Sequence, residues 1–502
     1  MNLLIKNVQI IGSDQKLPDS LDVFVSGEKI AAIGLFPGKK ADTIIDGRGC
    51  YLAPGFIDVD TESDHYLSIL NNPGQDDFLK QGVTSIIGGL CGASLAPLLY
   101  GSLESIEEWV DVRSVNVDWH TMGEFLNLIS QKKLGVNFGT LVGHTTLRQA
   151  IIGKTPRNLT KNELTVLGEV LKRAVSEGGL GLSTGLGYVQ SRETPYSELK
   201  FLVKIVQDLG GVYATHLRDD AEGLTESLAE TIKITEETGS KTLISHFVPV
   251  KGYESKYEQA LRQLEGLPNK LDLNFSIYPS DSRILKLYTF LPPWAQKDDL
   301  KVMALGLKDE WLSKKIIQDL PKIDPKKFVV AQAPDNEFVV GYSLEELRKI
   351  YSFKTYEEAL IKLMLTTNLK ATIFYKNIDY DLIKKAIQNS KSLIASNAAS
   401  FKDDLWHKAL KPERAVSTFT NFLALIFKDK IMSIEDGIKK ITYEPARKFG
   451  MRERGVIRSG YFADLVGFRE DKIEFVVVNG RIAVLNGERI DNSAGKVLKH
   501  RA

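Results

Sequence analysis

From residue 56 onward, the sequence alternates between short apolar runs typical of buried strands and segments with apolar residues at helical spacing. This repetition predicts parallel strands joined by crossover helices. One helix should begin at Thr160, because Glu163 follows it at capping-box spacing, and another should cover 222–238. We predict an α/β fold, a (β/α)8 barrel of the TIM type, because eight runs qualify as strands: 56–60, 83–88, 136–142, 179–184, 211–216, 241–246, 271–279 and 393–397.

The two ends of the chain have a different pattern. Residues 1–55 contain short alternating apolar runs, and residues 448–502 return to alternation, with Asn479-Gly480 and Asn486-Gly487 as tight-turn dipeptides. We predict that 1–55 forms an antiparallel layer and that 448–502 joins it in one small β-sandwich. Residues 56–447 are then the barrel domain.

A long segment, about 284–390, lies before the last predicted barrel strand. It includes helical patterns over 300–318 and 356–365. A single crossover needs fewer helices, so we expect a helical insertion there, either a lid or a small subdomain beside the barrel mouth.

Composition favours a small-molecule enzyme over a nucleic-acid or membrane module. The 502 residues carry a formal net charge of +1 with lysine and glutamate interspersed, so no overall field attracts a polyanion. No apolar run reaches the length of a bilayer span and no secretory signal is evident, which predicts a cytoplasmic protein. The two cysteines, Cys50 and Cys91, cannot make a disulfide framework, so each is a buried apolar residue or a metal ligand.

Three potential metal ligands lie at predicted strand ends. His216 ends the fifth strand, His246 ends the sixth, and Cys91 follows the second. The carboxyl ends of barrel strands share one mouth, so these side chains should converge there. Two imidazoles and a thiolate with a position left for water are typical of a catalytic zinc site. The alternative is that each is an ordinary interior residue.

Three acidic residues follow the first barrel strand at alternating positions. Asp58, Asp60 and Glu62 would point to one side of an extended chain. Like charges at that spacing raise one another's pKa unless a cation or a basic side chain lies between them. We therefore expect a compensating group nearby.

Other polar side chains near the strand ends could bind a substrate. A basic side chain could hold a carboxylate, a tyrosine could donate to a developing oxyanion, and an imidazole could orient a substrate or a ligand. A structural role remains open for each of these candidates: His144, Tyr188, Arg218, Lys251, Tyr278 and Arg414. We expect the remaining histidines to be surface or structural residues: His65, His120, His407 and His500.

Motifs spread over the whole chain have the order of one enzyme family. They are P-G-F-I-D (54–58), C-G-A-S-L-A-P (91–97), V-G-H-T-T-L-R (142–148), G-L-G-L-S-T-G-L-G-Y (179–188), H-L-R-D-D (216–220), I-S-H (244–246), L-P-P-W-A (291–295), T-Y-E-P-A-R-K-F-G (442–450) and G-V-I-R-S-G-Y-F-A-D-L-V (455–466). Taken together, they resemble the N-acyl-D-amino-acid deacylases, or D-aminoacylases, of the amidohydrolase superfamily.

The resemblance implies a barrel flanked by a β-sandwich, with one zinc ion held by Cys91, His216 and His246. It implies hydrolysis of a C–N bond other than a peptide bond, in a small-molecule substrate such as an N-acyl amino acid. It also implies contacts with that substrate from residues near the family's binding positions, which here are Lys251, Tyr278, Ser282 and Arg414.

Two places depart from the family's pattern. The family begins its barrel with His-x-His, where this chain has Asp60-x-Glu62. It ends the eighth strand with Ser-Asp-Gly, where this chain has Ser396-Asn397-Ala398. Asn397 has no titratable acceptor near neutral pH, so it cannot replace the family's acid/base carboxylate.

Three functional hypotheses follow. In the first, hydrolysis persists, and Asp60 or Glu62 serves as a relocated base or as an oxygen ligand beside the zinc. In the second, turnover is lost and the protein binds a ligand or a regulatory partner. In the third, the same site opens a cyclic amide. We favour the first, because one open zinc site with a nearby carboxylate is chemically sufficient.

Overall fold

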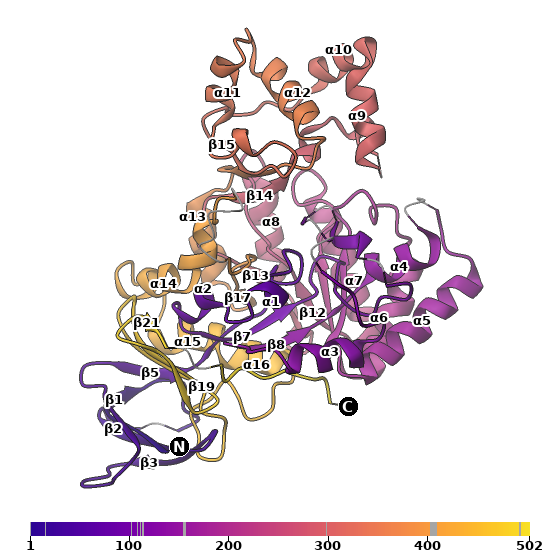
Figure 1. Cartoon of the computed structure of the whole chain (residues 1–502). Coiled ribbons are helices and arrows are strands. Elements are labelled where there is room, and N and C mark those ends of the chain that lie inside the picture. The colour runs from indigo at the N-terminus through magenta and orange to yellow at the C-terminus, as the bar shows by residue number, and fades with distance from the viewer. Residues whose placement is uncertain are drawn as a thin grey trace.

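A computed structural model describes residues 2–15, 17–101, 103–107, 109–110, 112, 115–153, 157–297, 299–401, 409–490 and 493–501. The chain forms a central barrel, a β-sandwich built from both ends of the sequence, and an insertion (Figure 1). The sandwich and the insertion lie on opposite sides of the barrel (Figure 1).

Parallel strands form the barrel, which confirms the predicted fold. They pair in the orders β6–β7–β8 and β9–β10–β11–β12–β13–β17. Leu180 N–H donates to the Thr140 carbonyl (2.8 Å) and Asn397 N–H to the Asp60 carbonyl (2.7 Å), so the two sets join into a closed barrel. The strands are β6 (Phe56–Asp58), β7 (Val83–Gly88), β8 (Asn137–Thr140), β9 (Val142–Gly143), β10 (Gly181–Gly185), β11 (Val212–His216), β12 (Lys241–Ile244), β13 (Leu273–Ile277) and β17 (Ser392–Ile394).

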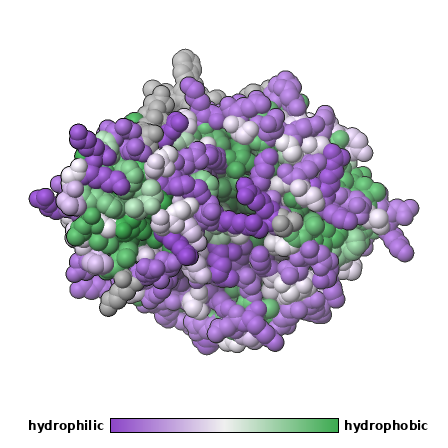
Figure 2. Space-filling view, turned by 90° about the horizontal axis from the view of Figure 1, so that it is seen from below, coloured by the Kyte–Doolittle hydropathy of each residue, from purple (hydrophilic) through white to green (hydrophobic). Residues whose placement is uncertain are grey.

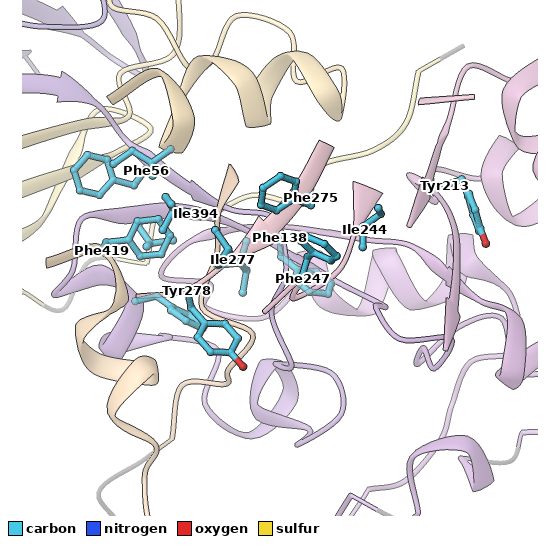
Figure 3. Close-up of a cluster of buried hydrophobic side chains, with 14 of the residues drawn as sticks. Phe56, Phe138, Tyr213, Ile244, Phe247, Phe275, Ile277, Tyr278, Ile394 and Phe419 are labelled. Atoms are coloured by element: carbon cyan, nitrogen blue, oxygen red, sulfur yellow. The ribbon is translucent and has the colours of Figure 1, made fainter. Parts of the chain in front are cut away.

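Amphipathic helices cover the barrel. The helix predicted after Thr160 begins as expected, because Thr160 and Glu163 form the two hydrogen bonds of a capping box. Phe56 of β6 stacks on Phe419 of α14, with ring centroids 5.9 Å apart, in the buried cluster of Figure 3. The helices are α1 (Ser68–Asn71), α2 (Asp76–Leu79), η1 (Glu104–Ile106), α3 (Met122–Ser130), α4 (His144–Ile152), α5 (Lys161–Ser176), α6 (Tyr196–Asp208), α7 (Leu224–Thr238), α8 (Glu254–Glu265), α13 (Tyr380–Gln388), α14 (Glu413–Phe427), α15 (Ile434–Ile441) and α16 (Tyr443–Lys448).

The sandwich joins both ends of the chain. β1 pairs antiparallel with β2 but parallel with β4 and β5, so the expected purely antiparallel layer is wrong. β1 is long enough to pair with β4 through its first half and with β5 through its end. Asn479 and Gly480 have φ of 45° and 77° in the tight turn before β20. The strands are β1 (Asn2–Ile10), β2 (Leu21–Ser26), β3 (Lys29–Gly34), β4 (Thr43–Asp46), β5 (Tyr51–Pro54), β18 (Leu465–Arg469), β19 (Lys472–Val478), β20 (Arg481–Leu485) and β21 (Glu488–Arg489).

The insertion contains the expected helices together with an antiparallel sheet that the sequence pattern did not indicate. Its antiparallel sheet has the order β14–β16–β15 and carries a separate apolar core. The helix expected over 300–318 breaks at Asp309, whose carboxylate caps α10 by accepting from Leu312 N–H at 2.8 Å. The elements are β14 (Arg283–Lys286), η3 (Leu287–Phe290), η4 (Pro293–Ala295), α9 (Leu300–Lys308), α10 (Glu310–Asp319), β15 (Phe328–Gln332), η5 (Glu337–Val339), α11 (Leu344–Ile350), α12 (Tyr356–Thr366) and β16 (Thr372–Tyr375).

The molecular surface mixes hydrophilic side chains with apolar patches on the face shown in Figure 2. Within the described part of the chain, none of the helices combines the length and the apolar composition that a membrane span requires.

Candidate metal centre

Cys91, His216 and His246 converge at the carboxyl ends of the barrel strands. One ligand atom from each lies within 4.8 Å of the other two. Cys91 Sγ is 3.3 Å from His246 Nε2, and the two imidazole rings are 4.4 Å apart and nearly perpendicular. His216 ends β11, and the other two residues follow the ends of β12 and β7. The arrangement suits a soft or borderline cation such as zinc, which binds thiolate and imidazole ligands tetrahedrally.

The backbone around this group adopts an uncommon conformation. Cys91, His246 and Asn397 have φ of 51°, 37° and 44°, in the left-handed region that residues with a Cβ seldom occupy. Such conformations cost about 1–3 kcal/mol each and cluster at functional sites. All three follow the carboxyl ends of barrel strands, so the turns that carry the candidate ligands are strained in the same way.

Burial controls the protonation of the three candidate ligands. It raises the pKa of the Cys91 thiol well above its ordinary value, and the carboxylates of Asp60 and Glu62 raise it further. Burial lowers the pKa of His216 to about 3 and that of His246 to about 4. At neutral pH the imidazoles therefore keep their lone pairs, while the thiolate needs a cation beside it to form.

Asp60 is fixed beside this group through one of its carboxylate oxygens. Its Oδ2 accepts from Ser276 Oγ at 2.7 Å and from His246 N–H at 3.1 Å. Its Oδ1 is buried and has no hydrogen-bond partner among the described residues. Burial raises the pKa of Asp60, which moves it toward the range of a general base. The free oxygen can therefore accept a proton or a hydrogen bond from a bound molecule.

Glu62, Asn397 and Arg414 form a chain at the same mouth. Asn397 Nδ2 donates to Glu62 Oε1 at 3.4 Å, and Asn397 Oδ1 accepts from Arg414 Nη2 at 3.0 Å. Glu62 Oε2 is buried without a partner among the described residues. Burial raises the pKa of Glu62, whereas the charge of Arg414 lowers it. Arg414 is the compensating basic group that the acidic residues led us to expect.

The three acidic residues do not form one row, contrary to the expectation from their alternation. β6 ends at Asp58, and the Asp58 carboxylate accepts from Ser396 N–H at 3.1 Å, where the last strand meets the first. Burial raises its pKa to about 7. Asp58 therefore helps to close the barrel, and only Asp60 and Glu62 lie beside the candidate ligands.

Three further predicted residues lie around the site. Tyr188 packs edge-on against His216, with ring centroids 4.9 Å apart. Tyr278 is buried beneath Arg414, whose guanidinium carbon is 4.5 Å from the ring centroid. Ser282 contacts Arg414 through its backbone carbonyl, which accepts from Nη1 at 3.3 Å. Tyr278 and Ser282 therefore position Arg414.

Other predicted binding residues have structural partners or lie elsewhere. Arg218 pairs with Glu230 at 2.8 Å and also donates to backbone carbonyls, so its guanidinium is not free to bind a carboxylate as we expected. His144 pairs with Glu198 on α6 at 2.8 Å, and Lys251 is exposed. The pairing of Arg218 with Glu230 depends on how α7 folds beside the end of β11, which the sequence pattern does not give.

Several side chains at the mouth were missed by sequence reasoning. His65 is fully buried, stacks on Trp109 at 5.1 Å and interacts electrostatically with Glu62. Asp64 accepts from Gly89 N–H at 2.6 Å, and burial raises its pKa to about 7. Asp220, paired with Arg283, interacts electrostatically with His216 and His246. The signal for Asp64 and His65 was their place two and three residues after Glu62.

The other histidines lie away from these groups or outside the described residues. His120 is exposed, and His500 Nε2 lies 2.7 Å from the Leu209 carbonyl. His407 falls in 402–408, outside the described residues.

The chain has relatives among known proteins over most of its length. It is 27% identical to a D-aminoacylase of Alcaligenes xylosoxydans xylosoxydans over 456 residues, which are 89% of this chain and 84% of the relative. It is 28% identical to an N-acyl-D-aspartate deacylase of the same organism over 457 residues, 89% of this chain and 81% of the relative. No protein-family model matches the chain.

Solved structures share the fold. A D-aminoacylase crystal structure, described as defining a novel subset of amidohydrolases, superposes with a TM-score of 0.82 at 24% identity over 99% of both chains. An N-acyl-D-glutamate deacylase from Bordetella bronchiseptica, complexed with zinc and a phosphonate inhibitor, superposes with a TM-score of 0.79 at 22% identity, again over 99% of both chains.

Proposed function

The chain is a homologue of the D-aminoacylases and N-acyl-D-amino-acid deacylases of the amidohydrolase superfamily, and we propose that it is a metal-dependent amidohydrolase that cleaves the amide bond of a small N-acyl amino acid. The observation that carries the proposal is the convergence of Cys91, His216 and His246 beside the free oxygen of Asp60. Metal ligands alone would serve a structural site, but a fixed carboxylate beside them supplies a proton acceptor.

Cys91, His216 and His246 would hold one zinc ion. Three protein ligands leave a coordination position open, as in catalytic zinc sites. The zinc in the Bordetella deacylase supports this choice of metal. When bound, zinc polarises the scissile carbonyl and lowers the pKa of an adjacent water molecule. The buried Asp60, Glu62 and thiolate together supply the negative charge that a divalent cation requires.

Asp60 is the proton acceptor in this proposal. Ser276 and the His246 N–H fix its Oδ2, so Oδ1 faces the site without a competing hydrogen bond. It would take a proton from water as the water oxygen bonds to the amide carbon. The same proton would then pass to the amide nitrogen as the C–N bond breaks. The products are a carboxylic acid and an amino acid.

Arg414 would hold the substrate carboxylate. Its Nε is buried without a hydrogen-bond partner among the described residues, and its side chain is fixed by Asn397, Tyr278 and the Ser282 carbonyl. A guanidinium positioned in this way can bind a carboxylate in a defined orientation.

The test is zinc analysis of the purified protein together with a hydrolysis screen. The screen contains N-acyl amino acids of both configurations and cyclic amides. We expect one zinc per chain and turnover of at least one N-acyl amino acid. A protein that holds stoichiometric zinc yet hydrolyses no member of the panel would favour a ligand-binding role, and turnover of cyclic amides alone would favour ring opening.

A further inference from the structure

Beside Arg414, the structure has a partly open cleft of about 220 Å³. It lies between the insertion and the residues that lead into α14. We propose that this cleft, named here the lysine cleft, binds a second anionic group of the substrate, joined to the scissile amide by an apolar spacer. The inference rests on the proposed function and specifies its substrate class.

Basic residues dominate the charged lining of the lysine cleft. Four lysines and Arg414 line it, with Glu413 as the single acidic residue of the described lining: Lys326, Lys327, Lys376, Lys411 and Arg414. The whole chain has a formal net charge of only +1, so this cluster is a local feature. A concave surface lined by one sign of charge focuses the field and attracts a ligand of the opposite sign.

Three of these lysines form only exposed ion pairs, which leave their ammonium groups available to a ligand. Lys326 is 4.0 Å from Glu345, Lys376 is 3.5 Å from Asp281 and Lys327 is 3.0 Å from Asp324, and the three lysine side chains are 47–78% exposed. Exposed pairs at such distances contribute roughly 0–1 kcal/mol. Their carboxylates do not line the cleft. An anion inside the cleft can therefore compete for the ammonium groups at low cost.

Apolar side chains of the lysine cleft also border a small pocket nearer the candidate metal centre. Ile284, Phe374 and Pro412 line both the cleft and this pocket of about 20 Å³, whose lining includes Glu62. Arg414 lines the cleft and also contacts Asn397, the hydrogen-bond partner of Glu62. A substrate held by Arg414 would thus extend an apolar segment past Ile284 and Phe374 toward the lysines.

The candidate metal centre and the lysine cleft carry charges of opposite sign. The candidate metal centre is surrounded by buried acids, whereas the outer cleft is lined by bases. A volume of about 220 Å³ is smaller than the roughly 300–1,000 Å³ of pockets that hold a whole ligand. The cleft therefore fits part of a substrate, and its chemistry selects a carboxylate or another compact anion on the amino-acid side chain or on the acyl chain.

Three matched substrates show whether the second anionic group belongs to the amino-acid side chain or to the acyl chain. N-Acetyl-methionine carries one carboxylate, N-acetyl-glutamate adds one on the side chain, and N-succinyl-methionine adds one on the acyl chain. We expect one of the two dianions, in the enantiomer that is accepted, to exceed N-acetyl-methionine in kcat/KM by about 10-fold at low salt. The substrate that shows the excess identifies which moiety enters the lysine cleft.

The decisive variant replaces Lys326, Lys327 and Lys376 with glutamine. We expect it to abolish most of the roughly 10-fold preference through KM, while kcat/KM for N-acetyl-methionine stays within about twofold. Lys411 is retained because it pairs with Asp77 at 2.8 Å. The control removes three exposed lysines outside the lining, Lys132, Lys133 and Lys161, and should leave the preference intact.

A binding measurement keeps the inference separate from the proposed function. Titration calorimetry with glutarate, a dianion that cannot be hydrolysed, should show about 10-fold weaker binding to the triple variant than to wild type and control. Equal glutarate affinity in all three proteins would overturn the lysine cleft even if amide hydrolysis is observed. Absence of hydrolysis would refute the proposed function. The comparison of glutarate affinities would then be the only test of whether the lysine cleft binds an anion.

Discussion

The side-chain amide of Asn397 donates to the carboxylate of Glu62 at 3.4 Å, across 335 residues of sequence. The same amide accepts from Arg414 at 3.0 Å, so Asn397 links a buried acid to a buried base. An aspartate at 397 would place a second carboxylate beside Glu62, with repulsion between them. The asparagine at 397 and the acidic residue at 62 are therefore compatible with each other.

This relationship predicts the effect of Asn397→Asp. The new carboxylate should raise the pKa of Glu62, and its burial should lower the free energy of unfolding by on the order of 1–3 kcal/mol at pH 8. The loss should shrink as the pH falls toward 5, because protonation of either carboxyl group removes the repulsion between them. Thermal unfolding of the variant and of wild type at the two pH values measures this loss of stability. In the Glu62→Gln background the substitution should be much better tolerated, and an equal loss there would contradict the proposed coupling.

The two cysteines provide a matched test of the metal site. Loss of a residue that only orients a metal ligand typically weakens metal binding by roughly 10–100-fold. Cys91→Ser removes a proposed ligand itself, so it should weaken zinc binding by more than this and abolish turnover. Cys50→Ser is the control, because Cys50 lies near Arg469 in the sandwich. Metal analysis after dialysis against a weak chelator measures both variants. Equal zinc content in the two would exclude Cys91 as a ligand.

Asp60→Asn tests the proposed base. It preserves the size of the side chain but removes the proton acceptor, so kcat should fall about 10²- to 10⁴-fold while zinc stays bound. Ser276→Ala removes only the 2.7 Å hydrogen bond that orients Asp60 and should lower kcat less. Steady-state kinetics and zinc content are the measurements. If Asp60→Asn retains full activity and Glu62→Gln does not, Glu62 is the base.

The buried Asp64 should make stability depend on pH. Its pKa is raised from 3.8 to about 7, so its carboxyl group is protonated in the folded protein and ionised in the unfolded chain between these values. Its unfavourable contribution is therefore absent below pH 3.8, grows as pH rises, and is complete above about 7. The free energy of unfolding of Asp64→Asn should exceed that of wild type by an amount that grows from pH 5 to pH 8 and reaches a few kcal/mol at most. A difference in unfolding free energy that stays constant over this range would contradict the raised pKa of Asp64.

Two arginines differ in their expected roles. Arg414→Gln should raise KM for an N-acyl amino acid, because it removes the proposed carboxylate ligand. Arg218→Gln should instead lower the melting temperature and leave KM unchanged, because it breaks the pair with Glu230. Kinetics and thermal unfolding of both variants distinguish these outcomes. A large rise in KM for Arg218→Gln alone would reverse the assignment.

The sequence by itself determined the barrel and the convergence of Cys91, His216 and His246. Both depend on local pattern and on a general rule, because parallel strands bring their carboxyl ends to one mouth whatever the intervening residues are. The capping box at Thr160 and the turn at Asn479-Gly480 were predictable for the same reason, since a few adjacent residues determine each of them. The strands of the insertion were missed because short apolar runs do not distinguish a strand from a helix.

Only the tertiary structure decided what each charged side chain at the mouth does. Asp58 binds the backbone of the last strand, Asp60 is fixed by Ser276, and Glu62 contacts Asn397. These partners lie more than 200 residues away in the sequence, and spacing along the chain carries no information about them. Arg414 lies beside the buried acids and Arg218 pairs with Glu230, because the fold decides which groups come to lie beside each charge.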